Sequence, residues 1–344
     1  MGHFECEISV DGAPLGEPIS WRQTLNTTEA YTECEVEYAS ATVKTVAFVP
    51  YGYDMLVVKK TVAPKSGGAK TADVKFKYKF TDKDSTYPPA RTIMRQRQYE
   101  AQPNSASLFY TIFGHKGYNG EISATSSAPA KVSTDNTSLT LESHFDLSKG
   151  GASSAYFVTY ADDFNKGNRE KNSAALKKYI SEKGFEGIFA DHKQNWKNFW
   201  GNEFVALPDA PMQDAYQTGL YHLRTVCTKW SFPVGLMGHG AAWSGRFFGF
   251  DEMFAQSGAV SAGKFDISVR TPNFRKDLLP VAMRRVQHYS DNSIKKFGAR
   301  YAWESLEDGS EGAPNPAGFW IDHVFHMANI CLLYTSPSPR DTER

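Results

Sequence analysis

The chain has no excess of charge of either sign, few cysteines and no long apolar run, and each of these absences excludes a class of protein. Its 344 residues carry 38 Lys and Arg against 38 Asp and Glu, so the formal net charge is zero. A nucleic-acid binder that neutralises phosphates needs a basic surplus or patch, so nucleic acid is not an expected partner. No stretch approaches ~18 continuous apolar residues, so no membrane-spanning helix is expected.

The four cysteines show neither a CxxC pair nor regular spacing. They predict neither a disulfide framework nor a zinc site, and no motif implies a cofactor. The first residues lack a charged segment followed by an apolar one, so a cytoplasmic location follows if Met1 is the true start. The chain begins within a strand-like segment, which suggests that Met1 is internal. A signal peptide could then precede it, and the location stays open.

Residues 1–165 carry the pattern of β-strands. Around Phe76 and Tyr78, apolar residues alternate with lysines, which is the period of two expected for a strand with one buried face. The segments 33–48 and 55–62 are rich in Val, Thr and Tyr, and Gly-rich breaks punctuate the region. This pattern predicts an antiparallel β-sandwich domain.

The pattern changes to a helical period near Gly167. Residues 166–204 predict a helical linker whose buried face includes Ile188, His192 and Trp196. Residues 205–330 predict further helices, the first of them capped by Asp209. Two more are expected over 253–260 and 277–289, and Pro280 is tolerable in the latter only in its first turn. Long loops over 232–250 and 297–320 separate these helices, and their length is typical of functional loops.

The first long loop concentrates the residue types that sugar sites need. Aromatic faces cover the apolar side of a sugar ring, while Arg and carboxylates hydrogen-bond to its hydroxyls. The candidate substrate-binding residues of this loop are Trp243, Arg246, Phe250, Asp251 and Glu252. Asp251 and Glu252 also fit the start of a helix, where the dipole favours negative charge.

The second long loop and the segment after it supply the candidate acids. Glycoside cleavage needs a carboxylic acid to protonate the leaving oxygen and a second group to activate the nucleophile. His323 and His326 have a spacing that suits a metal, but no third ligand is specified, so they are assigned to substrate binding. The candidates are Glu304, Glu311 and Asp322 as acids, and Trp303, His323 and His326 as substrate-binding residues.

Four motifs together resemble a known family. They are His192-x-x-x-Trp196, Trp243-x-Gly-Arg-Phe-Phe-x-Phe-Asp-Glu252, Arg284-Arg-Val-x-x-Tyr289 and Gly298-Ala-Arg-Tyr-Ala-Trp-Glu-Ser305. The chain from about residue 30 to 330 resembles glycoside hydrolase family 65 of the six-hairpin glycosidase superfamily, which includes maltose, kojibiose and trehalose phosphorylases. The resemblance implies a multidomain β + α protein: an N-terminal antiparallel β-sandwich, a helical linker and the first part of an (α/α)6 barrel.

The resemblance also implies a chemistry, namely cleavage of α-glucosidic bonds with inversion by water or by phosphate, without a metal or a nucleotide. It assigns sugar binding to Asp251. The family's acid is a Glu two residues before a His, and if that His is His326, Val324 occupies the position. Asp322 is then the nearest carboxyl group. An oligosaccharide or disaccharide is the expected substrate. Whether inorganic phosphate is a second substrate, and whether the full-length protein forms a homodimer, both stay open.

The chain is expected to be a fragment, inactive alone. Residues 205–330 are too few for twelve helices, and residues 331–344 contain a Ser-Pro-Ser-Pro run that predicts a non-native tail. Two alternatives remain. One is a glycosidase of another six-hairpin family with a non-glucose substrate, and the other is a carbohydrate-binding protein without catalytic activity.

Overall fold

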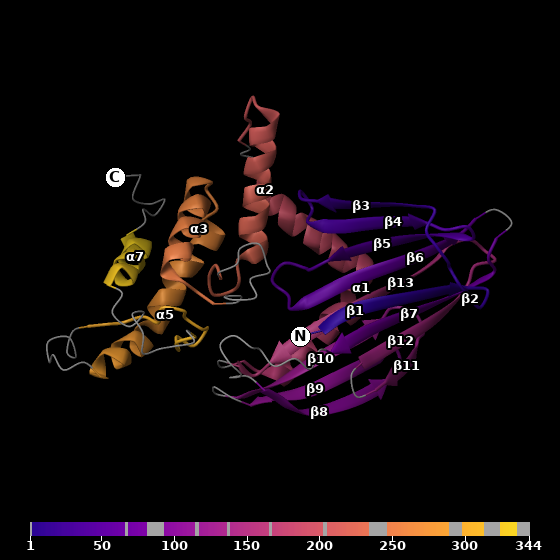
Figure 1. Cartoon of the computed structure of the whole chain (residues 1–344), viewed down its shortest axis with the longest axis horizontal. Helices are drawn as coiled ribbons and strands as arrows, with labels where there is room; N and C mark the ends of the chain where they lie inside the picture. The colour runs from indigo at the N-terminus through magenta and orange to yellow at the C-terminus, as the bar shows by residue number, and fades with distance from the viewer. Residues whose placement is uncertain are drawn as a thin grey trace. The chain divides into compact units, whose positions relative to one another are not determined.

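A computed structural model describes residues 2–65, 68–80, 93–113, 117–135, 138–164, 167–201, 205–233, 246–288, 298–312 and 324–335. The chain divides into two compact units, the first holding the described residues up to 201 and the second those from 205 onward. The first is an antiparallel β-sandwich with one long helix, and the second is helical (Figure 1). The predicted multidomain β + α class is confirmed.

The sandwich consists of an eight-stranded and a five-stranded sheet. The larger has the strand order β3-β4-β5-β6-β13-β10-β9-β8, the smaller β11-β12-β7-β1-β2, and every pairing in both is antiparallel. The strands are β1 (Gly2–Val10), β2 (Ala13–Pro14), β3 (Ser20–Asn26), β4 (Tyr31–Glu37), β5 (Ala41–Phe48), β6 (Met55–Pro64), β7 (Thr71–Phe80), β8 (Ile93–Gln102), β9 (Ser105–Phe113), β10 (Tyr118–Ser126), β11 (Lys131–Thr134), β12 (Ser138–Asp146) and β13 (Ala152–Asp162).

The core of the sandwich lies between the two sheets. In β7, Val74, Phe76 and Tyr78 are buried there, whereas the lysines between them are partly exposed. Phe76 stacks on Tyr156 of β13 with ring centroids 4.5 Å apart, so the two sheets are joined by an aromatic contact. The predicted alternation around Phe76 is confirmed.

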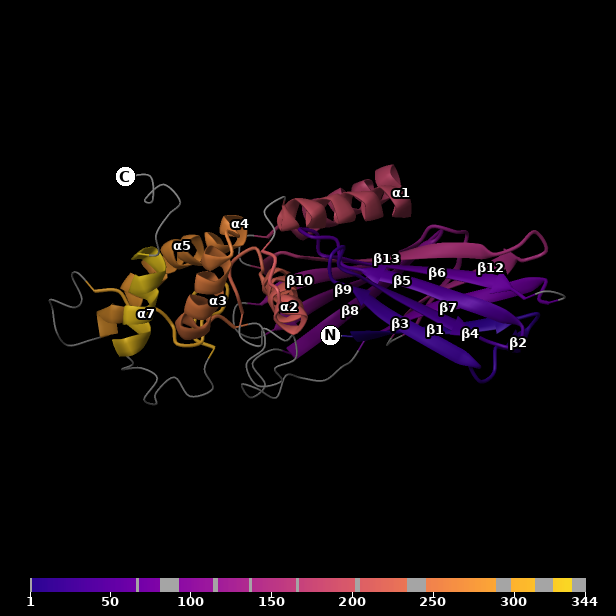
Figure 2. The ribbon, with the colours of Figure 1, turned by 90° about the horizontal axis from the view of Figure 1, so that it is seen from above.

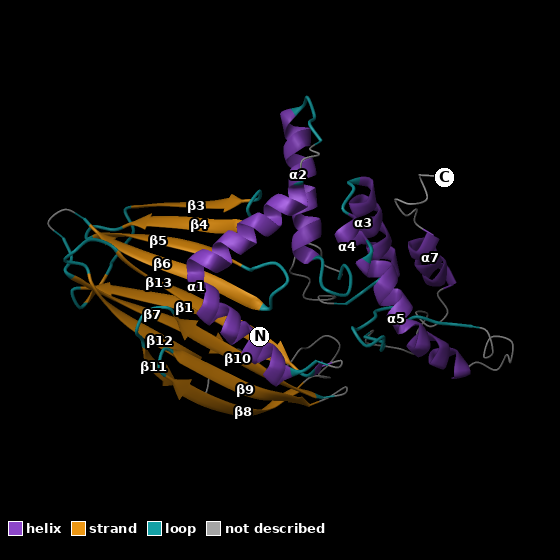
Figure 3. Cartoon of the chain, turned by 180° about the vertical axis from the view of Figure 1, so that it is seen from behind, coloured by secondary structure: helices purple, strands orange, loops and turns teal. Residues whose placement is uncertain are grey.

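Helix α1 (Arg169–Trp200) covers the outer face of the eight-stranded sheet (Figures 2 and 3). Its predicted apolar face is confirmed, since Ile188 and Trp196 are buried and Ile188 joins a cluster with Phe48 and Phe157 of the sheet. Gly184 interrupts the helix with a non-helical backbone, φ 57° and ψ −171°. The break at Gly184 lies within the predicted helical linker, and a residue with a Cβ would be strained there.

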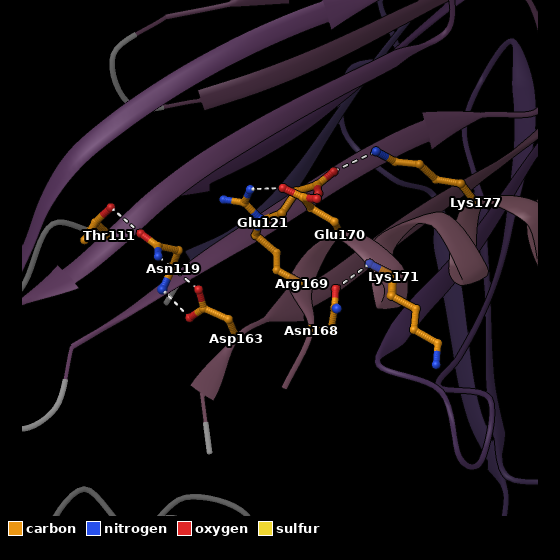
Figure 4. Close-up of polar contacts among 9 residues, drawn as sticks. All are labelled: Thr111, Asn119, Glu121, Asp163, Asn168, Arg169, Glu170, Lys171 and Lys177. Carbon is orange, nitrogen blue, oxygen red and sulfur yellow. Dashed lines mark hydrogen bonds and ion pairs between the residues drawn. The ribbon is translucent and has the colours of Figure 1, made fainter. Parts of the chain in front are cut away.

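A buried carboxylate fastens the first half of α1 to the sheet (Figure 4). Glu121 of β10 is 4% exposed and accepts hydrogen bonds from Lys177 of α1 and from Ser123, each at 2.7 Å. Burial disfavours ionisation of Glu121, but these hydrogen bonds outweigh it, so its pKa lies below the usual value for Glu. Asn168 caps the helix by accepting a hydrogen bond from the Lys171 amide.

The helical unit is built around a small core. Phe247, Phe274, Leu278, Tyr301 and Ile330 are central in it. None of the described helices is both long and apolar enough to cross a membrane. The elements of this unit are α2 (Ala210–Val226), α3 (Gly249–Ser261), α4 (Phe265–Ser268), α5 (Arg270–Arg285), the 3-10 turn η2 (Val286–His288) and α7 (Val324–Thr335).

Three helix boundaries in this unit bear on the predictions. Asp209 caps α2 as predicted, accepting a hydrogen bond from the Met212 amide at 2.8 Å. The prediction for α5 is wrong, because the helix begins at Arg270 and holds Pro280 in its interior, although proline cannot donate the usual helical hydrogen bond. Helix α7 continues five residues past Ile330, and Leu333 is buried in the core of the unit.

Candidate functional site

The two candidate loops meet through a short antiparallel contact. The backbone N–H of Phe247 donates to the carbonyl of Ser305 at 2.9 Å, and the Ser305 N–H donates back at 3.0 Å. Ser305 also forms a bridge with Glu311, and the Gly312 N–H donates to the Glu304 carbonyl at 2.7 Å. The segment 298–312 thus folds back on itself beside the start of α3.

Arg246 and Glu304 form a buried ion pair across this contact. Their side chains are 9% and 3% exposed, and a terminal nitrogen of Arg246 donates to Oε2 of Glu304. Burial raises the pKa of Glu304, and the positive charge of Arg246 opposes that rise. The pair joins one residue of each predicted loop, so the structure brings Arg246 and Glu304 together.

Glu311 stabilises the backbone of the second loop. Its two carboxylate oxygens accept the N–H groups of Trp303 and Glu304 at 2.9 and 2.8 Å, and Arg285 of α5 donates to it at 3.1 Å. Three donors, one of them charged, therefore engage this carboxylate. Because both of its oxygens are bound to backbone N–H groups, these contacts suit a loop-stabilising role better than the predicted acid role.

Asp251 and Glu252 lie in the first turn of α3, in agreement with the helix start that is one interpretation of their sequence. Glu252 is fully buried and accepts two hydrogen bonds from Arg275 of α5, the one from Nε at 2.8 Å. A terminal nitrogen of Arg275 also donates to the Phe247 carbonyl at 3.2 Å. Burial raises the pKa of Glu252, which Arg275 opposes. This environment leaves Glu252 no access to a ligand.

Among residues 246–252, the part of the first candidate segment that the structure describes, Phe250 and Asp251 are the accessible ones. Phe250 is 42% exposed and packs edge to face with Phe254, one helical turn later, with ring centroids 5.0 Å apart. Asp251 is half-buried, and this burial raises the pKa of its carboxyl group. A carboxylate beside an exposed aromatic ring can hydrogen-bond to a sugar whose apolar face lies on that ring.

Trp303 and His326 pack together beneath the start of α3. The indole ring lies 5.2 Å from the imidazole of His326 and 5.5 Å from the ring of Phe248, centroid to centroid. His326 is 1% exposed, and its Nε2 donates to the carbonyl of Ala302 at 2.9 Å. A Cβ on Gly249 would meet the His326 ring at 3.0 Å, so glycine permits this approach of α3 to α7. His326 therefore fixes the loop rather than facing a ligand.

Three predicted site residues, Trp243, Asp322 and His323, lie outside the described residues. Sequence reasoning missed Arg275 and Arg285, the arginines that bind Glu252 and Glu311. Arg285 lies within one of the motifs quoted above, which was the available signal. No sequence signal pointed to Arg275, because the predicted helix over 277–289 begins after it. Within the described ranges, no three His, Cys, Asp or Glu side chains gather as a metal site.

Comparisons with known proteins support the fold. No protein-family model matches the chain, and no curated protein matches it in sequence. Among solved structures, a candidate kojibiose phosphorylase from the human microbiome superposes with a TM-score of 0.67 at 12% identity. The match covers 96% of this chain and 45% of that protein, so the chain spans less than half of its length. At this identity the likeness concerns the fold alone.

A bacterial glucoamylase complexed with acarbose is also similar. The match has a TM-score of 0.47 at 10% identity and covers 81% of this chain and 45% of that one. This likeness is too distant to support a shared fold.

Proposed function

We propose that the protein is a carbohydrate-active enzyme that cleaves α-glucosidic bonds with inversion, by hydrolysis or phosphorolysis. One observation carries the proposal. The half-buried Asp251 and the exposed Phe250 lie in the first turn of α3, and the Arg246–Glu304 ion pair connects this turn to the second loop. The motifs of these two loops are those that resemble family 65. The fold likeness to the candidate kojibiose phosphorylase supports the same direction.

In this proposal the residues have separate roles. Asp251 binds hydroxyl groups of the sugar in the cleaved subsite, and Phe250 contacts its apolar face. Arg246 and Glu304 keep the two loops in register. Asp322 donates the proton to the leaving oxygen, since Glu304 and Glu311 are engaged with Arg246 and with backbone N–H groups. Water or phosphate then attacks the anomeric carbon from the opposite face, which inverts its configuration.

The test uses the protein expressed from its source gene, at the length that the gene encodes. Maltose, kojibiose and trehalose are supplied with and without inorganic phosphate, and glucose and glucose 1-phosphate are quantified. Turnover only with phosphate indicates a phosphorylase, and turnover without it a hydrolase. Proton NMR of the first product should show the β-anomer, and the α-anomer would contradict inversion.

Variants then test the assigned roles. Asp322→Asn should abolish turnover and keep sugar binding, whereas Glu307→Gln, in the second loop but outside the proposed machinery, should change neither. Asp251→Asn should weaken sugar binding. Unchanged turnover in Asp322→Asn would move the acid to another carboxyl group.

A carbohydrate-binding protein without catalytic activity is the second candidate. It is favoured by the engagement of Glu304 and Glu311 in structural contacts and by Val324 at the position of the family's acid. Sugar binding without turnover on a broad panel of glycosides would support it. Turnover of non-glucose substrates alone would instead support another six-hairpin family.

A further inference from the structure

Among the described strands, three of the four sheet edges carry features that hinder pairing with another chain. β2 has two residues and β11 has four, which is too short to template a partner strand. β8 has a register shift between Met94 and Gln96, and its sequence holds charged residues at Arg95, Arg97 and Glu100. Bulges and charges are the usual protection of an edge.

The fourth edge, β3, has seven residues, no register shift and one charged residue, Arg22. It lies at the margin of the eight-stranded sheet, next to β4 alone (Figure 1). Its residues Ser20 to Leu25 are all exposed, and its pairing with β4 has no register shift. Trp21 is 69% and Leu25 is 49% exposed, and residues two or four apart share one face of a strand. An apolar stripe therefore runs along an open edge.

Two copies of β3 placed antiparallel to each other bring compatible residues into opposite positions. It reads Ser-Trp-Arg-Gln-Thr-Leu-Asn, with Gln23 at its centre. In an antiparallel pair of two such strands centred on Gln23, Trp21 lies opposite the partner's Leu25, and Arg22 lies opposite the partner's Thr24. The apolar residues then meet and no like charges oppose each other, which favours the pair.

We propose that a second copy of this chain docks on this edge, β3 to β3, about a two-fold axis that passes through Gln23. The two eight-stranded sheets become one continuous sheet, and each copy uses the same surface, as an isologous dimer requires. This inference does not depend on the sugar chemistry of the helical unit.

Charge on the other face of β3 fits the same partner. A groove of about 350 Å³ lies beside β3, lined by Ser20, Trp21, Arg22, Thr24 and Thr42 and by three glutamates of β4: Glu33, Glu35 and Glu37. Arg22 makes no side-chain ion pair with a described residue. In the proposed register the partner's Arg22 lies opposite Thr24, whose neighbour on β4 is Glu33. Glu33 and Glu37 already pair with Lys44 and Lys65, so the partner's Arg22 would share Glu33 with Lys44.

A seven-residue strand pair is small compared with a standard protein interface, so we expect a reversible dimer whose population rises with concentration. Sedimentation velocity on the full chain over a concentration series measures it. The double variant Trp21→Lys/Leu25→Lys places like charges opposite each other and should raise the dimer Kd at least about tenfold. Val49→Lys is the matched control, because Val49 is 60% exposed and lies outside β3.

Cysteine crosslinking tests the register. Paired residues of antiparallel strands have Cα atoms about 4.5–5.5 Å apart, within the range of a disulfide. Cys34 lies opposite Gln23 on β4 and Cys331 is exposed, so both are first replaced by serine. In that background Gln23→Cys should form a disulfide-linked dimer on mild oxidation. The Arg22→Cys and Thr24→Cys variants should crosslink to each other when they are mixed. Neither variant should crosslink when it is oxidised alone.

The proposal is overturned if the chain stays monomeric over the whole series, or if the double lysine variant dimerises like the Val49→Lys control. It is equally overturned if Gln23→Cys gives no crosslink, or if Arg22→Cys alone crosslinks as well as Gln23→Cys does. Far-UV circular dichroism of each variant verifies that the sandwich is folded, which an exposed edge strand should allow.

Discussion

Replacing Arg275 by methionine should strongly destabilise the helical unit. The Arg275 and Glu252 side chains are both 0% exposed, so the substitution leaves a buried carboxylate without its counter-charge. Breaking a buried pair in this way costs about 3–5 kcal/mol. Loss of the hydrogen bond to the Phe247 carbonyl adds about 1 kcal/mol. We therefore expect the free energy of unfolding to fall by roughly 4–6 kcal/mol.

The loss should depend on pH in a defined direction. Burial raises the pKa of Glu252, and the charge of Arg275 opposes that rise, so Arg275→Met should raise the pKa further. A carboxyl group whose pKa is raised by folding favours the folded state while it is protonated, and this contribution is lost as the pH rises through the folded-state pKa. The variant should therefore be least impaired at acid pH and most impaired at neutral pH.

Hydrogen exchange of peptides from α3 and α5 measures this unit separately from the sandwich. Glu252→Gln/Arg275→Met removes both charges and should be more stable than Arg275→Met alone. Arg284→Met, on an exposed position of the same helix, should change stability by less than about 0.5 kcal/mol. Arg275→Met within about 1 kcal/mol of the wild type at neutral pH would refute the reasoning, given the cost expected for a buried pair.

Three further predictions concern other positions. Glu121→Gln should lower the melting temperature at neutral pH and flatten its fall toward acid pH, because a lowered pKa gives stability that is lost as the pH falls through it; circular dichroism melts check this. Gly249→Ala should destabilise α3 against α7 by about 1–3 kcal/mol, measured by urea unfolding, since its Cβ would lie 3.0 Å from His326 and Ile330. Gly184→Ala should cost about 1–2 kcal/mol in the same assay, because φ is +57° there and no atom obstructs the new Cβ.

The sandwich and the start of α2 could be predicted from the sequence because their signals are local. Alternation around Phe76 follows from one buried face, and the cap at Asp209 follows from one hydrogen bond. Pro280 shows where local rules fail. The unfavourable position of Pro280 inside α5 is outweighed by burial of Leu278 and Ala282 on either side of it, which a local rule about proline does not include.

The site could be predicted only as a set of residue types. Carboxylates in loops suggested catalysis, yet Glu311 and Glu252 are engaged with Arg285 and Arg275. These partners lie 26 and 23 positions away in the sequence, so no local pattern identifies them. Arg246 and Glu304 were both selected, but their pairing depends on the contact between Phe247 and Ser305. Residue types identified the candidate functional side chains. Ion pairs between residues far apart in the sequence determine which of those side chains remain accessible to a ligand.

The segment 298–312 contains neither helix nor regular strand, and such segments are where proteases commonly cut. This one is attached to α5 along its length: the Arg300 N–H donates to the Ala282 carbonyl, Gly309 lies against Leu278, and Glu311 binds Arg285. It should therefore resist cleavage for as long as α5 is folded. A ligand that binds to it would not have to order it first, so little of the binding energy is lost to conformational entropy.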